Sequence, residues 1–136
     1  MSEQFDPTAR AVLDKVHVVG PKRSDVFPMA VDTAATHTGL RPDYLRMLGI
    51  ALQRPAARKR VRAATGATVA PLFQVPRVTA LEQNRTDFLV AAQDLPRGVE
   101  ADGLLGLDFF RGLVLTLDFA RGRAALRPRR WWHLWN

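Results

Sequence analysis

The amino-acid sequence predicts an all-β domain with one or two short helices. Short runs rich in Val are separated by clusters of Gly, Pro, Asp and Ser, a pattern typical of strands joined by turns. Hydrophobic residues make up 47% of the 136 residues, which allows an ordinary core and excludes a disordered chain. The length suits one domain, and it excludes an enzyme with a cleft between two large lobes.

The first predicted elements are a hairpin and a helix. Val-rich residues 16–19 and 26–31 flank the sequence Gly-Pro-Lys-Arg-Ser-Asp, which has a turn-forming composition. Residues 32–39 are small and polar, and they predict a loop. Pro42 suits the first turn of a helix and Gly49 the position just past its end, so a two-turn helix is predicted over 41–48.

The second half of the chain predicts more strands and one helical turn. Residues 57–64 alternate basic and small apolar side chains, which is typical of a strand with one exposed face. The other predicted elements are strands at 67–78, 86–92, 104–105, 113–117 and 123–126, a loop at 94–103 and a helical turn at 107–111.

The formal net charge of +7 is concentrated in two segments. Residues 53–77 carry six basic and no acidic side chains, and 121–136 carry five basic and no acidic ones. The basic hairpin could attract nucleic acid or acidic substrates, although a solvated basic face is the plainer interpretation. Between Lys22 and Phe73 the aromatic residues are Phe27 and Tyr44, too few for a base-stacking platform, so a nucleic-acid partner is not favoured.

The composition also limits the chemistry. The chain has no Cys, which excludes disulfides, thiolate nucleophiles and sulfur-ligated zinc. The three His are scattered, so we expect neither a metal nor another cofactor. The first residues lack the basic and then apolar pattern of a secretory signal. The most apolar stretch, 103–119, is interrupted by charges too often for a membrane span of about 20 residues, so a cytoplasmic protein is expected.

Two segments about seventy residues apart carry the functional signal. The first is Asp32-Thr33-Ala34-Ala35, and the second is Leu104-Leu105-Gly106-Leu107-Asp108-Phe109-Phe110. Between them lie Leu48-Gly49 and the predicted hairpin around Gly66. The Asp-Thr-Ala-Ala sequence alone is common, but the ordered set is much more specific. Together these motifs resemble the retropepsin-like (retroviral-type) aspartic protease family of the bacterial single-domain type, over roughly residues 14–127.

The resemblance implies a closed β-barrel that forms half of an acid protease, in a homodimer whose protomers each contribute one catalytic Asp. Asp32 matches the catalytic residue, Thr33 the residue whose hydroxyl bonds across the dimer axis, and Ala35 the small residue beside them. Ala34 stands where the family has Gly. The remaining matches are a flap at Thr65, Gly66 and Ala67 and a second loop at Leu104, Leu105 and Gly106.

The implied domain covers 14–127, between an N-terminal extension (1–13) and an Arg/Trp-rich tail (128–136). In such a dimer, two carboxylates held close together share one proton. One acts as a base on water, and the other donates a proton to the peptide carbonyl. The predicted function is therefore an aspartic endopeptidase acting on peptides or proteins. The alternative is a dimer that has lost catalysis, because of the Ala34 methyl, and binds peptides or a protein partner.

Plainer interpretations remain for several residues. Asp32 without the family match would be a turn-capping Asp. Asp102, in an Asp-Gly turn, and Asp108 are other sources of a second carboxylate, but Asp108 is interpreted as a structural group capping the start of a helix. His37 could line a substrate subsite or be solvated. The three Trp of the tail favour packing on the domain or its dimer mate, with a partner or a membrane interface as alternatives.

Overall fold

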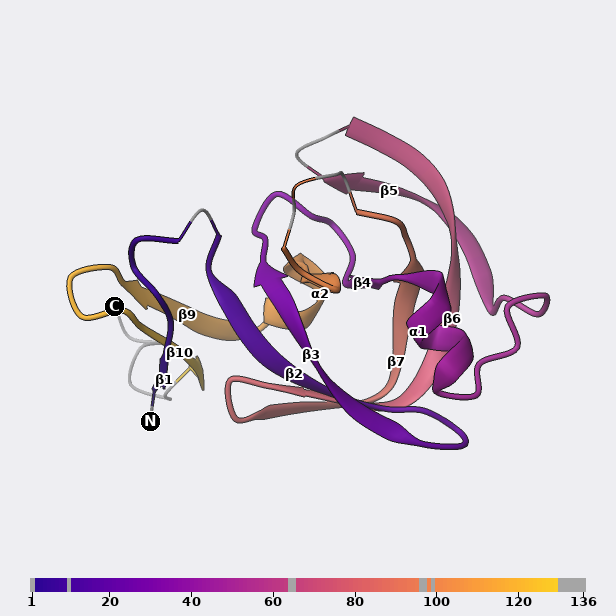
Figure 1. Cartoon of the computed structure of the whole chain (residues 1–136), viewed down its shortest axis with the longest axis horizontal. Coiled ribbons are helices and arrows are strands. Elements are labelled where there is room, and N and C mark those ends of the chain that lie inside the picture. Colours follow the sequence, from indigo (N-terminus) through magenta and orange to yellow (C-terminus); the bar gives the residue numbers. More distant parts are fainter. Residues whose placement is uncertain (1, 10, 64–65, 96–97, 99, 130–136) are drawn as a thin grey trace.

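The computed structural model describes residues 2–9, 11–63, 66–95, 98 and 100–129, and it confirms a mainly β fold with two short helices among them (Figure 1). The elements, in chain order, are β1 (Glu3–Gln4), β2 (Leu13–Val19), β3 (Ser24–Val31), β4 (Gly39–Leu40), α1 (Pro42–Met47), β5 (Ala57–Ala63), β6 (Gly66–Ala80), β7 (Gln83–Ala92), β8 (Gly103–Leu105), α2 (Leu107–Phe110), β9 (Leu113–Asp118) and β10 (Arg123–Pro128).

Six strands close into a barrel. The strand order is β2-β3-β8-β4-β7-β6, and β2 pairs again with β6 through His17 opposite Thr79, which joins the two ends. Closure leaves these strands without a free edge. Strand β5 lies outside the ring and pairs with β6 alone, so the β5–β6 hairpin projects from the barrel at the top of the view in Figure 1.

The barrel interior is apolar because successive strand residues alternate between the inner and outer faces. In β2, the buried Val16 and Val18 alternate with the exposed Lys15 and the half-buried His17. The largest fully buried side chains are Phe109, Met29, Leu40, Leu45, Leu48, Leu72, Leu105, Val16, Val18, Val75, Val78 and Val90. Phe109 comes from α2, so this short helix closes the core from outside the ring of strands.

Strand β8 lies between β3 and β4, and this order positions the site. It is parallel to β3, with Leu105 opposite Val31, and antiparallel to β4, with Leu104 opposite Gly39. The connection from β3 to β4, residues 32–38, therefore passes the end of β8. Residue 39 was predicted as the end of a loop and is instead in β4. That prediction was wrong, since a two-residue strand is too short to show a periodic pattern.

Strand boundaries differ most at the β6–β7 hairpin. The strand predicted at 67–78 continues to Ala80, and the strand predicted at 86–92 already begins at Gln83. Leu81 and Glu82 form the turn with positive φ angles of 50° and 66°. Such turns usually contain Asn or Gly, so the sequence carried no turn signal at this place.

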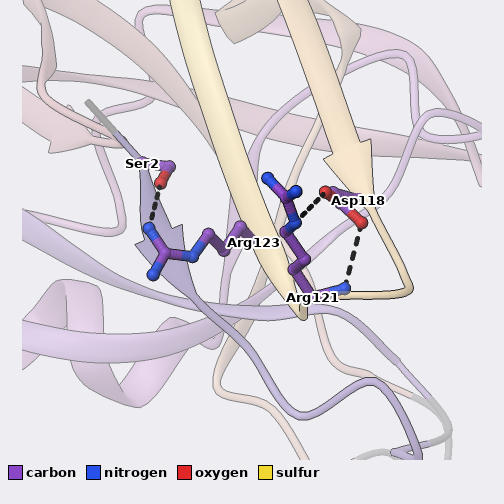
Figure 2. Close-up of polar contacts among 4 residues, drawn as sticks. All are labelled: Ser2, Asp118, Arg121 and Arg123. Carbon is purple, nitrogen blue, oxygen red and sulfur yellow. Dashed lines mark hydrogen bonds and ion pairs between the residues drawn. The ribbon is translucent and has the colours of Figure 1, made fainter.

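Strands near both ends of the chain form a separate three-stranded sheet, β1-β10-β9, at the left of Figure 1. Strand β1, in the predicted N-terminal extension, pairs with β10 through Glu3 opposite Ala124. Figure 2 shows the Arg123 guanidinium donating to the Ser2 hydroxyl (3.5 Å). The Asp118 carboxylate accepts a hydrogen bond from the Arg121 backbone N–H (3.0 Å), which stabilises the β9–β10 turn.

Neither helix in the described part of the chain is long and apolar enough to cross a membrane. Residues 130–136, which contain the three Trp of the predicted tail, lie outside the described residues, as does Thr65 of the predicted flap.

A buried carboxyl group links the terminal sheet to the barrel. Asp14 of β2 is 7% exposed, and its Oδ2 has no hydrogen-bond partner among the described residues. Burial, and then the neighbouring Glu3 of β1, raise the pKa of Asp14 from 3.8 to about 8. Between about pH 4 and about pH 8, Asp14 therefore stays protonated in the folded protein and loses its proton in the unfolded chain.

This proton makes stability depend on pH. We expect the free energy of unfolding to fall as the pH rises from about 4 to about 8, since the unfolded state binds fewer protons there. Asp14→Asn removes this titration, so it should flatten the decline and stabilise the protein by about 1–2 kcal/mol at the upper end. Urea unfolding of both proteins across this range measures the effect. Parallel stability profiles of parent and variant would contradict it.

Candidate active site

Asp32 lies directly after β3, in a tight turn attached to β8. Its backbone N–H donates to the Leu105 carbonyl (3.0 Å), and its carbonyl accepts from the Ala35 N–H (3.1 Å). The half-buried carboxylate accepts a hydrogen bond from the Ala34 N–H through Oδ1 (2.9 Å). The strand end and the turn together orient this carboxylate, and among the described residues the hydrogen bond to it is at Oδ1.

The two sequence motifs meet at this turn. The Leu107 N–H donates to the Ala35 carbonyl (2.9 Å), and the Gly106 N–H donates to the Thr38 hydroxyl (3.1 Å). A Cβ on Gly106 would lie 2.7 Å from the His37 carbonyl carbon and 3.0 Å from the Ala35 oxygen. Backbone atoms cannot move aside cheaply, so the close approach of the two loops requires glycine here.

Asp108 holds the other end of the same loop. Its Oδ1 accepts hydrogen bonds from both the N–H (2.9 Å) and the hydroxyl (2.7 Å) of Thr38. The N-cap of α2 is Gly106, and no side-chain cap hydrogen bond forms there. The prediction of helix capping by Asp108 was therefore wrong, because the carboxylate is committed to Thr38 across the loop. Sequence analysis did not single out Thr38, which has no signal other than its place in the polar run.

Thr36 links the Asp32 loop to the β5–β6 hairpin by hydrogen bonds. The Thr36 N–H donates to the Arg62 carbonyl (2.8 Å), and the Arg62 N–H donates to the Thr36 hydroxyl (2.9 Å). The Thr36 hydroxyl also lies 2.9 Å from His37 Nδ1, so the half-buried His37 has a partner within the loop. Thr36 was not predicted as a site residue.

Apolar contacts also join the β5–β6 hairpin to the Asp32 loop. Ala63 of β5 packs against a buried cluster that includes Ala35 and Leu104. Ala63 pairs with Gly66, so the residues Gly66 and Ala67 of the predicted flap begin β6; residues 64–65 lie outside the described part of the chain.

A pocket of about 290 Å³ lies between the β5–β6 hairpin and the end of β7. Polar side chains line it at Thr68, Gln93 and Asp94; the other lining residues are Val61, Ala63, Gly66, Ala67, Val69, Ala70, Pro71 and Ala92. Asp32 is not part of this lining.

The Ala34 position does not require glycine in this backbone. The non-glycine residues with positive φ in the described part of the chain are Leu81, Glu82 and Asp87, so Ala34 has an ordinary φ. Its side chain is exposed, as is that of Thr33. The methyl group is therefore accommodated within one chain, and any crowding must come from another molecule.

The other carboxylates considered as partners of Asp32 lie elsewhere or are engaged. Asp102 precedes Gly103, which is opposite Met29, so Asp102 lies level with Pro28, about 13 Å along the strand from Asp32. Asp108 is bonded to Thr38. Within the described residues, no three His, Asp or Glu side chains gather as metal ligands.

A closed barrel, an Asp-containing turn interleaved with a Leu-Leu-Gly loop, and a hairpin over that turn define an acid-protease domain of the retropepsin-like type. The chain belongs to the aspartyl protease family, whose sequence profile matches residues 10–109. No curated protein and no solved structure matches the chain significantly.

Proposed function

We propose that the protein is a homodimeric aspartic endopeptidase in which Asp32 from each protomer forms the acid–base pair. The supporting observation is the single carboxylate at the site among the described residues of one chain. The half-buried Asp32 is flanked by the exposed Thr33 and Ala34. Of the alternative carboxylates, Asp102 lies away from Asp32 along the strand, and Asp108 is hydrogen-bonded to Thr38. A two-fold axis beside Thr33 would supply the second carboxylate.

In this mechanism the two Asp32 carboxylates share one proton, because like charges held close cannot both ionise. The ionised partner takes a proton from water as the water attacks the peptide carbonyl. The protonated partner donates its proton to the carbonyl oxygen, which gives a tetrahedral diol. As the C–N bond breaks, the carboxyl that took the proton from water gives it to the leaving amine, and the other carboxylate takes a proton back from a diol hydroxyl. The Ala34 N–H, bonded to Asp32 Oδ1 (2.9 Å), keeps each carboxylate oriented. The flap covers the substrate and excludes bulk water.

The test is cleavage of a mixed peptide library from about pH 3 to about pH 7, read by mass spectrometry. We expect cleavage with a bell-shaped pH profile and activity per chain that falls on dilution, as the dimer dissociates. Absence of cleavage while sedimentation reports an intact dimer would favour the alternative, a retropepsin-like dimer that binds peptides or a protein without cutting them.

Ala34→Gly separates these two functions. Because Ala34 has an ordinary φ, we expect the parent to be active and the variant to change its kcat/KM by less than about threefold. The variant should lose about 0.5–1 kcal/mol of stability through the greater freedom of Gly in the unfolded chain. Peptide cleavage and urea unfolding measure the two effects. Activity found only in Ala34→Gly would mean that the methyl crowds the paired site and that the natural protein is catalytically impaired.

A further inference from the structure

Strand β5 has a free edge in the described structure. It is the last strand of its sheet and pairs with β6 on one side only. The N–H and C=O of Arg62 bond to Thr36 rather than to β6. Backbone groups alternate in direction along an antiparallel strand, so those of Arg60 and Arg58 also point to the free side. Pro71, opposite Arg58, has no N–H to offer to a ladder bond, which agrees with this register.

The side chains beside this edge form a row of cations, which we call the arginine ladder: Arg58, Arg60 and Arg62. All three are exposed, and Val61, on the other face of β5, is buried. Alternate residues on a strand are about 6.6 Å apart. No acidic side chain of the described residues pairs with any member of the ladder, and residues 53–77 contain no Asp or Glu.

The free edge of β5 and the arginine ladder together select the kind of strand that can bind here. An unpaired edge can accept any extended chain, but the ladder repels the same strand of a second copy by charge. A segment with carboxylates at alternate positions meets both features at once, main-chain hydrogen bonds along the edge and ion pairs on one face. The residues opposite the ladder on β6 are Ala67, Val69 and Pro71, so this face offers no aromatic ring on which a nucleic-acid base could stack.

We propose that the free edge of β5 binds an extended acidic segment of a partner protein by strand addition, with the carboxylates of that segment opposite Arg58 and Arg60. The Arg62 backbone remains bonded to Thr36, and its guanidinium adds attraction at the end of the row. Binding does not depend on the chemistry of Asp32, so an Asp32→Asn variant retains it.

Two labelled peptides test the proposal at physiological ionic strength. In one, Glu alternates with Thr; in the other, the same residues are grouped into a Glu block and a Thr block. Fluorescence anisotropy should give an affinity about tenfold higher for the alternating peptide, because only it places every carboxylate on one face of a strand. Equal affinities would mean unspecific attraction of negative charge and would overturn the proposal, as would absence of binding.

Variants identify the surface. Arg58→Glu/Arg60→Glu should weaken binding of the alternating peptide by about tenfold or more. The matched control, Lys59→Glu/Arg77→Glu, makes the same change in net charge on the opposite face of β5 and at a distant position of β6. It should weaken binding by no more than about twofold. An equal loss in both variants would overturn the proposal. Circular dichroism shows that both variants are folded.

Amide hydrogen exchange separates strand addition from attraction by charge alone. In the free protein the amides of Arg58 and Arg60 should exchange fast and those of Lys59 and Val61 slowly, since the latter point to β6. The alternating peptide should protect Arg58 and Arg60. Binding without this protection, or tighter binding of a single-stranded uridine oligonucleotide than of the peptide, would overturn the proposal in favour of a polyanion surface.

Discussion

Asp32→Asn should reduce peptide cleavage by about 10³-fold or more while leaving the fold intact. Asn has the same shape as Asp, and its Oδ1 can still accept the Ala34 N–H, which lies 2.9 Å from Oδ1 in the parent. It can neither take a proton from water nor share a proton with a second carboxylate, so both catalytic roles are lost. Cleavage rate and urea unfolding of parent and variant, side by side, measure the two parts of this prediction.

The matched control is Asp102→Asn, another carboxylate-to-amide change at a residue level with Pro28 rather than with Asp32. This variant should keep the cleavage rate of the parent within about twofold. Activity in Asp32→Asn would rule out Asp32 as the acid–base residue. Loss of activity in Asp102→Asn with the fold intact would contradict the placement of Asp102 outside the site.

Asp32→Asn also tests the dimer. A mixed dimer of parent and Asp32→Asn contains one Asp32 carboxylate instead of two, so an excess of the variant should lower the activity of the parent as the chains exchange. Native mass spectrometry of isotope-labelled parent reports that exchange. Full parental activity in mixed dimers would show that one chain suffices, against the paired mechanism.

Phe109→Ala should lower the free energy of unfolding by about 3–5 kcal/mol. Phe109 is fully buried, and its ring makes edge contacts with Phe88 (5.9 Å between centroids) and Phe110 (6.2 Å). The Arg85 guanidinium lies over the ring at 5.8 Å and donates to the Phe109 carbonyl (2.8 Å). The substitution leaves a cavity at the end of the barrel. Urea unfolding monitored by circular dichroism measures the loss.

Phe119→Ala is the surface control, since Phe119 is 57% exposed and its ring contact is with Phe5 (5.4 Å). It should cost about 1 kcal/mol or less. Similar losses in the two variants would contradict a core role for Phe109. Because α2 also carries Asp108, which bonds to Thr38, the folded fraction of Phe109→Ala should have a lower kcat than the parent.

Much of the fold was predictable because it depends on local patterns. Strands β2 and β3 follow from Val-rich runs around a turn, and α1 follows from Pro42 and Gly49 at its ends. These signals are local side-chain and backbone preferences, so they are present before the chain folds. The β6–β7 turn was not predictable to the residue, because Leu81 and Glu82 adopt positive φ without a Gly or Asn.

For the site, the sequence by itself determined the motifs: Asp32-Thr33-Ala34-Ala35 and Leu104-Leu105-Gly106, in an order typical of the family whose profile matches residues 10–109. Only the tertiary structure decided how they meet. The insertion of β8 between β3 and β4 brings Gly106 against the 32–38 loop and directs the Asp108 carboxylate to Thr38 rather than to its own helix. The tertiary structure also shows that Ala34 has an ordinary φ and that β5 has a free edge. These features depend on contacts between residues far apart in the chain, which no local pattern encodes.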